Sequence, residues 1–342
     1  MALFIRFSDF ESLLAKWSRE RPVYVPRGIS NAIHYQKFAS ESQDSIVYDG
    51  IRAVEPLKTF FFRAKEKVAQ RPAVASAERG KASSSFVIVG AKSCDLRSVE
   101  CLDETFMKGD PQDPFYVERR NGATIISADC SAPAETCFCT MLGLKPYPEG
   151  GFDLNLSKIS QGLVVEVGSE KGESLVSQDR ALFAEASPEQ IAERDKVRED
   201  TLAKVKGQNE KFNLSKSFRD ITEEKLNSPA WNKYIGECKE CAACLSVCPT
   251  CHCFLLLDRK VDDGFERFRL WDFCYHHGYA RTAGGANARP TQQARFKNKY
   301  VKKFEFYMAK YGVYACTGCG RCIEACLANI DMRQVFKDLE GS

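Results

Sequence analysis

The sequence has no long apolar run and almost no net charge. Lys and Arg number 49 and Asp and Glu number 46 among its 342 residues, which gives a formal net charge of +3. An excess this small and this interspersed does not favour nucleic acid or an anionic membrane as the main partner. No apolar run reaches the roughly 18 residues that a membrane helix needs, and the mean hydropathy is −0.34. We therefore expect no membrane span and no nucleic-acid partner.

The sequence also lacks the common motifs of nucleotide-dependent and hydrolytic enzymes. Neither G-x-G-x-x-G nor G-x4-G-K-S/T occurs, and we interpret Gly284-Gly285 as a turn. The chain has only 4 histidines, and none stands in a Ser/His/Asp or zinc-protease spacing. We therefore predict no catalytic residues and no cofactor-binding residues beyond metal ligands.

We also expect no secretion signal, because Asp9 and Glu11 interrupt the start of the given sequence before an apolar stretch can form. From Ser8 onward the pattern predicts an amphipathic helix with a capping box of Ser8 and Glu11. Its apolar residues recur at helical spacing: Phe10, Leu13, Leu14 and Trp17. We expect a reducing, cytoplasmic location; the alternative is export of the folded chain with a twin-arginine partner.

Short strand patterns alternate with helical ones in the first part of the chain. Val23–Val25, Phe86–Val89 and Ala123–Ile126 predict strands, and a helix is expected after Pro56. This alternation predicts an N-terminal α/β domain, residues 1–215, with a mostly parallel sheet.

Further along, Leu163–Val167 and Glu173–Val176 predict a hairpin around a turn at Lys171-Gly172. Ser187 then opens a charged helix that we expect to end at Gly207. The polar stretch that follows marks a boundary, and residues 216–342 form the second predicted domain.

Cysteine is the abundant exception, with 16 residues. Two runs share the spacing C-x2-C-x2-C-x3-C, starting at Cys238 and at Cys316. In bacterial two-cluster ferredoxins this run binds a 4Fe-4S cluster through three cysteines, and its fourth cysteine binds the other cluster. One predicted ligand set is therefore Cys238, Cys241, Cys244 and Cys326. The other is Cys316, Cys319, Cys322 and Cys248.

Two other chemistries compete for these runs. A structural zinc ion usually needs two C-x2-C pairs, and the third cysteine in each run has no place in such a site. The spacing therefore favours iron-sulfur clusters over zinc. Cys248-Pro249-Thr250-Cys251-His252 also matches the haem c attachment motif, but haem c is attached outside the cytoplasm. The long gap between the runs contains helical patterns such as Tyr300–Tyr311. We therefore predict an α-helical ferredoxin-like domain with two 4Fe-4S clusters.

Four of the remaining cysteines follow predicted strands, where α/β folds build sites at the carboxyl ends of parallel strands. Together they could bind a third 4Fe-4S cluster: Cys94, Cys130, Cys137 and Cys139. The alternatives are buried free cysteines with one reactive pair, or zinc. We assign no role to the last four: Cys101, Cys251, Cys253 and Cys274.

A basic stretch near the second run is interleaved with aromatic residues. Its members are Arg289, Arg295, Lys297, Lys299, Lys302 and Lys303, with Phe296, Tyr300 and Phe304 between them. Such a pattern can bind nucleic acid, but we favour a helix face beside an anionic cluster or a partner subunit. Each oxidised cluster with four thiolates carries about −2, which such a face would offset.

An ordered set of motifs runs through most of the chain, from about residue 55 to residue 330. The set comprises Ala91-Lys92-Ser93-Cys94-Asp95-Leu96-Arg97, Asp113-Pro114-Phe115-Tyr116 with Arg119-Arg120, Asp129-Cys130, Cys137-Phe138-Cys139, Cys248-Pro249-Thr250-Cys251-His252-Cys253-Phe254, Trp271-Asp272-Phe273-Cys274, Gly284-Gly285-Ala286-Asn287-Ala288-Arg289 and Cys316-Thr317-Gly318-Cys319-Gly320-Arg321-Cys322. Together they resemble the family of anaerobic sulfite reductase A subunits and sulfhydrogenase beta subunits. Leu327, where a proline is usual, and His252 depart from the family pattern without removing a ligand.

The resemblance implies an iron-sulfur electron-transfer subunit of an anaerobic heteromeric oxidoreductase. Such a subunit relays electrons between an FAD- and NAD(P)-binding flavoprotein subunit and a terminal catalytic subunit of hydrogenase, sulfite reductase or heterodisulfide reductase type. One alternative is a catalytic reductase that binds substrate at a site-differentiated 4Fe-4S cluster, which would give Cys251, Cys253 and Cys274 a role. Another is a stand-alone ferredoxin-like carrier.

The predicted ligand sets can be tested at Cys241, which belongs to the first run. Replacing it in Cys241→Ala removes one of four thiolates and should abolish the EPR signal of one ferredoxin-type cluster while the other persists. Two undiminished signals in this variant would contradict the ligand assignment.

Overall fold

The computed structural model describes residues 2–40, 45–71 and 85–342. It divides into two compact units. Unit 1 comprises residues 1–57, 82–208 and 317–319, and unit 2 comprises residues 58–81, 209–316 and 320–342. The second cysteine run therefore belongs to unit 2 except for residues 317–319, which are grouped with unit 1.

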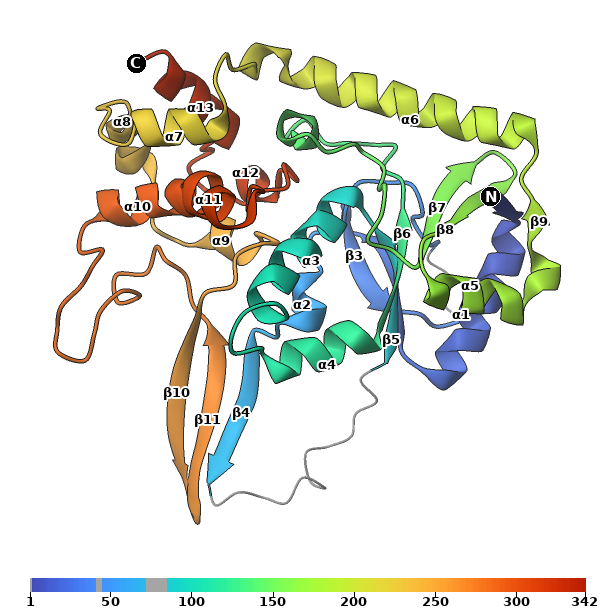
Figure 1. Cartoon of the computed structure of the whole chain (residues 1–342), viewed down its shortest axis with the longest axis horizontal. Helices are drawn as coiled ribbons and strands as arrows, with labels where there is room; N and C mark the ends of the chain where they lie inside the picture. The colour runs from blue at the N-terminus through green and yellow to red at the C-terminus, as the bar shows by residue number, and fades with distance from the viewer. Residues whose placement is uncertain (1, 41–44, 72–84) are drawn as a thin grey trace. The chain divides into compact units, whose positions relative to one another are not determined.

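Unit 1 is built on an eight-stranded sheet with the order β3-β2-β5-β6-β7-β8-β1-β9 (Figure 1). The central neighbours β2, β5, β6 and β7 run parallel, whereas β3 at one edge and β8, β1 and β9 at the other pair antiparallel. The strands are β1 (Ala2–Ile5), β2 (Val23–Ile29), β3 (Ala32–Lys37), β5 (Phe86–Ala91), β6 (Ala123–Ala128), β7 (Leu154–Ile159), β8 (Gly162–Val167) and β9 (Ala184–Glu185). The predicted N-terminal α/β domain with a parallel layer is confirmed, and antiparallel strands extend that layer.

Two neighbouring strands in the parallel part of the sheet belong to the core of unit 1. Every residue of β5 and of β6 is buried, as expected for strands covered by other elements on both faces. The helices of unit 1 are α1 (Phe7–Glu20), α3 (Ser93–Phe106), α4 (Pro114–Gly122), α5 (Glu170–Gln178) and α6 (Pro188–Asn209), of which only the final residue is grouped with unit 2. α3 directly follows β5, so its first turn lies at the carboxyl end of a central strand.

Helix α1 confirms the predicted amphipathic pattern but not its predicted start. Its buried side chains are the four predicted ones, Phe10, Leu13, Leu14 and Trp17. Arg6 is the N-cap residue and makes no side-chain capping hydrogen bond. The predicted capping box of Ser8 and Glu11 is therefore wrong, because the helix already begins at Phe7 and Ser8 lies inside its first turn.

The predicted hairpin after residue 162 is also wrong. β8 pairs with β7, and Glu173–Val176 belong to α5. Ser169 caps this helix by accepting a hydrogen bond from the Gly172 amide at 3.1 Å. A serine cap followed by acidic residues stabilises a helix N-terminus, so Lys171-Gly172 forms a first helical turn instead of a hairpin turn.

The charged helix predicted after Ser187 is α6 (Pro188–Asn209), which ends two residues beyond the expected Gly207. Ser187 and Gln190 form a reciprocal cap: the Gln190 amide donates to Ser187 Oγ, and the Ser187 amide donates to Gln190 Oε1. Capping of this kind satisfies backbone donors that the first helical turn leaves free.

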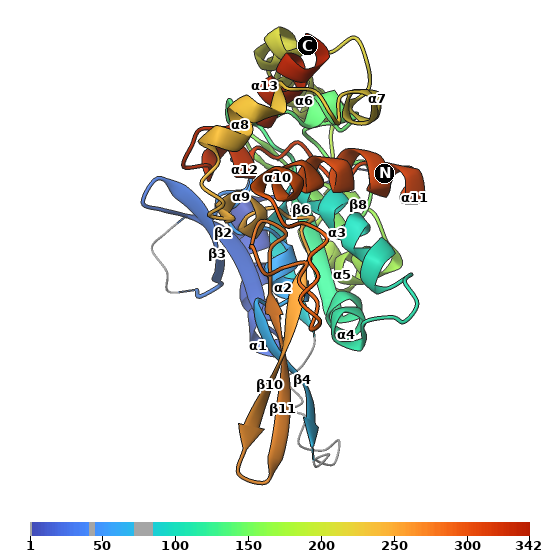
Figure 2. The ribbon, with the colours of Figure 1, turned by 90° about the vertical axis from the view of Figure 1, so that its left-hand side faces the viewer.

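Unit 2 combines short helices with a three-stranded antiparallel sheet of order β10-β11-β4 (Figure 2). The strands are β10 (Phe254–Val261), β11 (Gly264–Trp271) and β4 (Lys65–Arg71). The helices are α2 (Lys58–Phe61), α7 (Phe218–Glu224), α8 (Trp231–Glu237), α9 (Ala243–Ser246), α10 (Gln292–Tyr300), α11 (Tyr307–Tyr311), α12 (Arg321–Glu324) and α13 (Met332–Glu340). A π-helical stretch, Val301–Phe306, joins α10 to α11. The helix expected after Pro56 is thus one short turn, and the sheet was not predicted.

An aromatic cluster holds the helices of unit 2 together. Phe304 and Phe218 each contact Phe336 with ring centroids 4.7 Å apart, and Tyr300 contacts Trp231 at 5.0 Å. Edge-to-face pairs of this kind contribute about 0.5–1.5 kcal/mol each beyond their buried area. They fix α10 and the π-helical stretch against α7, α8 and α13.

No helix within the described ranges has both the length and the apolarity to cross a membrane. This agrees with the absence of long apolar runs in the sequence.

Two glycines of unit 1 provide a matched stability test. A Cβ at Gly172 would lie 2.0 Å from the carbonyl oxygen of Asp153, whereas a Cβ at Gly207 would meet no heavy atom within 4 Å. Gly172→Ala should destabilise the protein by about 1–3 kcal/mol through overpacking. Gly207→Ala should stabilise it by up to about 1 kcal/mol because alanine favours the helix. Urea unfolding followed by circular dichroism measures both, and shifts of the same sign would contradict the packing described for Gly172.

Candidate metal centres

The four thiols predicted for the first cluster line one hollow in unit 2. Its wall contains Cys238, Cys241 and Cys244 from the first run and Cys326 from the end of the second, together with Tyr275, Leu327 and Ala328. Cys241 is exposed and the other three cysteines are half-buried. The crosswise combination predicted from the spacing is therefore the combination that the fold brings together.

Both runs have the same backbone turns at equivalent positions. In the first run Glu240 and Ala242 have φ angles of 49° and 58°, and in the second Gly318 and Gly320 have φ angles of 61° and 76°. Non-glycine residues rarely adopt positive φ, so Glu240 and Ala242 hold a conformation that the surrounding structure must enforce. Successive turns of this type direct amide N–H groups toward one concave side, where they can bind anionic groups.

The same hydrogen bonds follow in each run. The Cys248 amide donates to the Leu245 carbonyl at 3.3 Å, and the Cys326 amide donates to the Ile323 carbonyl at 3.2 Å. Short helices, α9 and α12, occupy equivalent places after the second cysteine of each run. The two runs are thus two copies of one local fold.

Helix α10 positions the first run. Gln292 Nε2 donates to the carbonyl of Cys238 at 2.8 Å. The Arg295 guanidinium makes two hydrogen bonds to the Glu240 carboxylate, at 2.8 and 3.1 Å. This bidentate pair holds the strained turn at Glu240 in place.

The cysteines predicted for the second cluster are distributed differently. Cys248, Cys316 and Cys322 belong to unit 2, whereas Cys319 lies in the short segment grouped with unit 1. Cys248 is buried, and its Sγ lies 3.2 Å from Lys303 Nζ and 3.3 Å from Thr250 Oγ1. A hydrogen bond from the Cys251 thiol and the nearby Lys303 charge hold the pKa of Cys248 well below its ordinary value.

The basic stretch packs against these cysteines. Lys299 and Lys303 are buried, while Lys302 is exposed. Burial opposes ionisation of both lysines, but the Cys244 and Cys322 sulfurs help to raise the pKa of Lys299. The Cys248 and Cys316 sulfurs likewise help to raise the pKa of Lys303. The favoured interpretation of the stretch, as a helix face beside anionic clusters, agrees with this burial.

Lys58 fixes the loop that follows the first run. It is 1% exposed, and its Nζ donates to the Cys251 carbonyl at 3.0 Å. The ammonium also lies 4.2 Å from the ring centroid of Trp271, a favourable cation–π distance.

The cysteines without a predicted role lie in both units. Cys253 Sγ, in the loop after the first run, accepts a hydrogen bond from the Tyr279 hydroxyl at 3.2 Å. Cys274 is buried in unit 2, and Cys101 is buried on α3 in unit 1.

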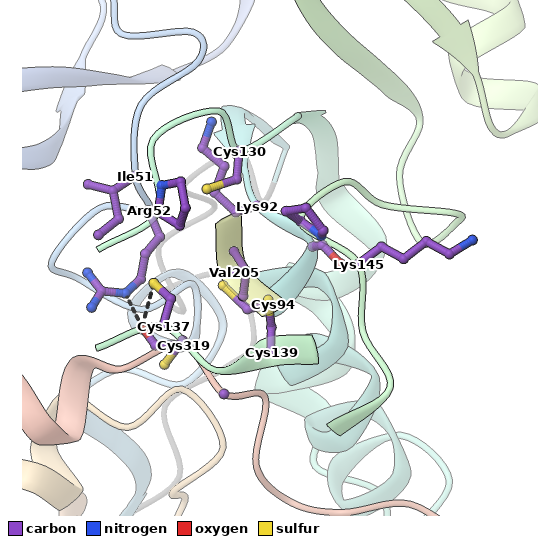
Figure 3. Close-up of a pocket in the computed structure, with 14 residues that line it drawn as sticks. Ile51, Arg52, Lys92, Cys94, Cys130, Cys137, Cys139, Lys145, Val205 and Cys319 are labelled. Atoms are coloured by element: carbon purple, nitrogen blue, oxygen red, sulfur yellow. Dashed lines mark hydrogen bonds between the residues drawn. The ribbon is translucent and has the colours of Figure 1, made fainter. Parts of the chain in front are cut away.

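The four thiols predicted for a third cluster line a single pocket in unit 1 (Figure 3). Cys94 lies in the first turn of α3 after β5, and Cys130 follows β6. Cys137 and Cys139 come from the next loop, and Cys139 begins a 3-10 turn. The carboxyl ends of parallel strands therefore assemble this site, as the sequence pattern suggested.

The pocket also contains residues that sequence reasoning did not assign to it. Gly318 and Cys319 line its wall. The Phe138 amide donates to the Gly318 carbonyl at 2.7 Å, and a Cβ at Gly318 would lie 2.5 Å from the backbone nitrogen of Cys139. Position 318 therefore requires glycine for space as well as for its positive φ. The sequence did contain a signal for this close approach, because Gly318 occupies the position that Glu240 has in the first run.

Two cations belong to the same wall. Arg52 Nε donates to the Cys319 carbonyl at 2.6 Å. Lys92 is 3% exposed, and its Nζ donates to the carbonyls of Asp129 and Tyr48 at 2.9 and 3.0 Å. Lys145, by contrast, extends away from the sulfurs (Figure 3). Arg52 and Lys92 could offset the negative charge of a cluster held by the four thiols.

Burial sets the protonation of these thiols. It raises the pKa of Cys137 to about 11 and that of Cys139 to about 12. Both are therefore neutral thiols near pH 7 unless a metal displaces their protons, which coordination does.

No group of three or more His, Cys, Asp or Glu side chains in the described part of the chain has the geometry to hold a metal ion. Four cysteines around one pocket nevertheless have the ligand number and type that a 4Fe-4S cluster needs.

Comparison with known proteins adds two findings. Residues 237–330 match the family described as 4Fe-4S dicluster domain. Over 338 residues, 97% of this chain and 96% of the relative, the sequence is 31% identical to sulfhydrogenase 2 subunit beta of Pyrococcus furiosus. The first match covers both cysteine runs, and the second extends over both units.

The pocket of unit 1 yields a prediction at Cys137. Cys137→Ala should leave both ferredoxin-type EPR signals intact, remove a third, and lower the iron content from about 12 to about 8 per chain, because each cluster holds four irons. Cys101→Ala is the matched control, since Cys101 is a buried cysteine of the same unit outside the pocket. Unchanged iron content in Cys137→Ala would refute a third cluster.

Proposed function

Because the chain belongs to the family of sulfhydrogenase beta subunits, we propose that it is a non-catalytic iron-sulfur electron-transfer subunit of an anaerobic oxidoreductase complex of hydrogenase type. The observation that carries this proposal is the hollow of unit 2, where one cysteine run and the last cysteine of the other line a common wall. Iron-sulfur ferredoxins with two clusters bind their clusters in this crosswise way.

Two 4Fe-4S clusters are proposed for residues 216–342, a ferredoxin-like domain of short helices that also contains the β10-β11 hairpin. The first is bound by Cys238, Cys241, Cys244 and Cys326, and the second by Cys316, Cys319, Cys322 and Cys248. The repeated backbone turns support the same chemistry in both runs. Each cluster, when bound, accepts and releases one electron. The chain binds the clusters, limits the access of water and places N–H donors near sulfur, which together set the potentials.

A third 4Fe-4S cluster is proposed in the α/β domain, residues 1–215, with Cys94, Cys130, Cys137 and Cys139 as ligands. Its support is the common pocket and the two cations, Arg52 and Lys92, in the pocket wall. Three centres in one chain would suit a relay, in which electrons enter at one cluster and leave at another.

The proposed partners are a flavoprotein subunit that binds FAD and NAD(P) and a terminal catalytic subunit, in a cytoplasmic heteromeric complex. The relative's name identifies it as a subunit of a sulfhydrogenase, which supports assembly with other subunits. The relative's name favours a terminal subunit of hydrogenase type; sulfite reductase and heterodisulfide reductase types are the alternatives.

The purified chain with its clusters distinguishes a relay from a catalytic reductase. It should take up electrons from a reduced viologen dye and pass them to a second dye, but turn over neither hydrogen nor sulfite. A cluster EPR signal that changes when sulfite is added to the isolated chain would favour a catalytic role instead.

Purification of the native complex should recover a flavoprotein together with this chain. Recovery of the chain alone would contradict the relay.

A further inference from the structure

The fourth cysteines of the two runs have equivalent positions but different surroundings. Cys326 Sγ accepts a hydrogen bond from the Ile330 backbone amide at 3.3 Å. Cys248 Sγ instead lies 3.2 Å from Lys303 Nζ. The local fold is repeated, yet one fourth cysteine contacts a neutral backbone donor and the other contacts a side-chain amine.

Lys303 is held in one orientation by three acceptors. Its Nζ lies 2.8 Å from Thr250 Oγ1, 3.0 Å from the Ala315 carbonyl and 3.2 Å from Cys248 Sγ. An ammonium group has three N–H donors and no acceptor, so these three partners account for all of them. The side chain is only 5% exposed, which keeps water from competing for its donors.

Thr250 supports the direction of these hydrogen bonds. Its hydroxyl donates to the Ala315 carbonyl at 2.7 Å. That single hydroxyl hydrogen cannot also go to Cys248, so Thr250 Oγ1 is free to accept from Lys303. The ammonium N–H is therefore the charged donor at the sulfur of Cys248.

We propose that Lys303 makes the cluster ligated by Cys248 the higher-potential member of the two ferredoxin-type clusters; this rests on the proposed function and its ligand sets. Reduction adds an electron to a group that already carries about −2. A buried cation that donates to a ligand sulfur stabilises the reduced form more than the oxidised form, because low dielectric strengthens their attraction. Charge-assisted hydrogen bonds are also roughly twice as strong as neutral ones, so the backbone donor at Cys326 has the smaller effect.

Three other buried cations of unit 2, Lys299, Lys58 and Arg295, do not cancel this asymmetry. Lys299 interacts electrostatically with Cys244 and Cys322, one ligand from each proposed cluster, so it shifts both potentials in the same direction. Burial lowers the pKa of Lys58, while Cys251 and Cys248 oppose that shift; in its protonated form Lys58 acts in the same direction as Lys303. Arg295 is paired with the Glu240 carboxylate, which neutralises its charge beside the first run.

The test is an EPR-monitored redox titration of the full-length chain with its clusters. In Lys303→Met, the reduced-to-oxidised ratio of the Cys248 cluster at its wild-type midpoint potential should fall about tenfold, equivalent to a 59 mV decrease. The Cys326 cluster should shift much less. Lys303→Gln keeps an N–H donor without charge and should give an intermediate shift. Lys302→Met is the matched control, since Lys302 is the exposed neighbour, and should shift neither cluster.

A second measurement does not depend on the Lys303 variants folding. Cys316→Ser removes a ligand of the Cys248 cluster, so of the two ferredoxin-type signals the one that survives should be the lower-potential one. Survival of the higher-potential signal, or an equal shift of both clusters in Lys303→Met, would overturn the proposal. Failure of the proposed function has a different result: the wild-type chain would then show fewer than two cluster signals and fewer than about eight irons.

Discussion

Burial of cysteine sulfur beside buried amines is the interaction on which the arrangement of unit 2 depends. A buried lysine is costly unless its donors are satisfied and its charge is compensated. Lys303 meets the first condition through Cys248, Thr250 and Ala315. Thiolates bound to anionic clusters would meet the second. The aromatic contacts of α10 and the π-helical stretch hold this lysine against the cysteine loops.

The two cysteine runs show how one local fold can serve two environments. Both use left-handed backbone turns before a short helix. In the first run Glu240 occupies such a turn and pairs with Arg295. In the second, Gly318 lies against the backbone of Cys139, which leaves no room for a side chain. The spacing of the ligands is therefore common to both runs, while the residues between them adapt each loop to its neighbours.

Sequence patterns predicted those elements whose stability is local or whose periodicity is strong. The four buried residues of α1 and the buried runs of β5 and β6 are examples. The predictions failed where a short segment had two plausible states. Glu173–Val176 has an apolar end that suits a strand, but the Ser169 cap selects a helix. Strand β4 was missed because it pairs with β11, a strand about 200 positions away in sequence, and such pairing leaves no local pattern. Strands β10 and β11 form a hairpin of consecutive segments, which sequence reasoning overlooked.

The sequence by itself determined the number and spacing of the cysteines, from which the kind of cluster and the crosswise ligand sets were predicted. Spacing suffices for this prediction because three proposed ligands of each cluster come from a single short loop. The tertiary structure alone decided which charges lie beside which sulfurs. Lys303 and Cys248 are 55 positions apart, and their contact depends on packing between a helix and a loop. It likewise decided that Gly318 and Cys319 line the pocket of unit 1, since strand ends and a distant loop meet only when the chain folds.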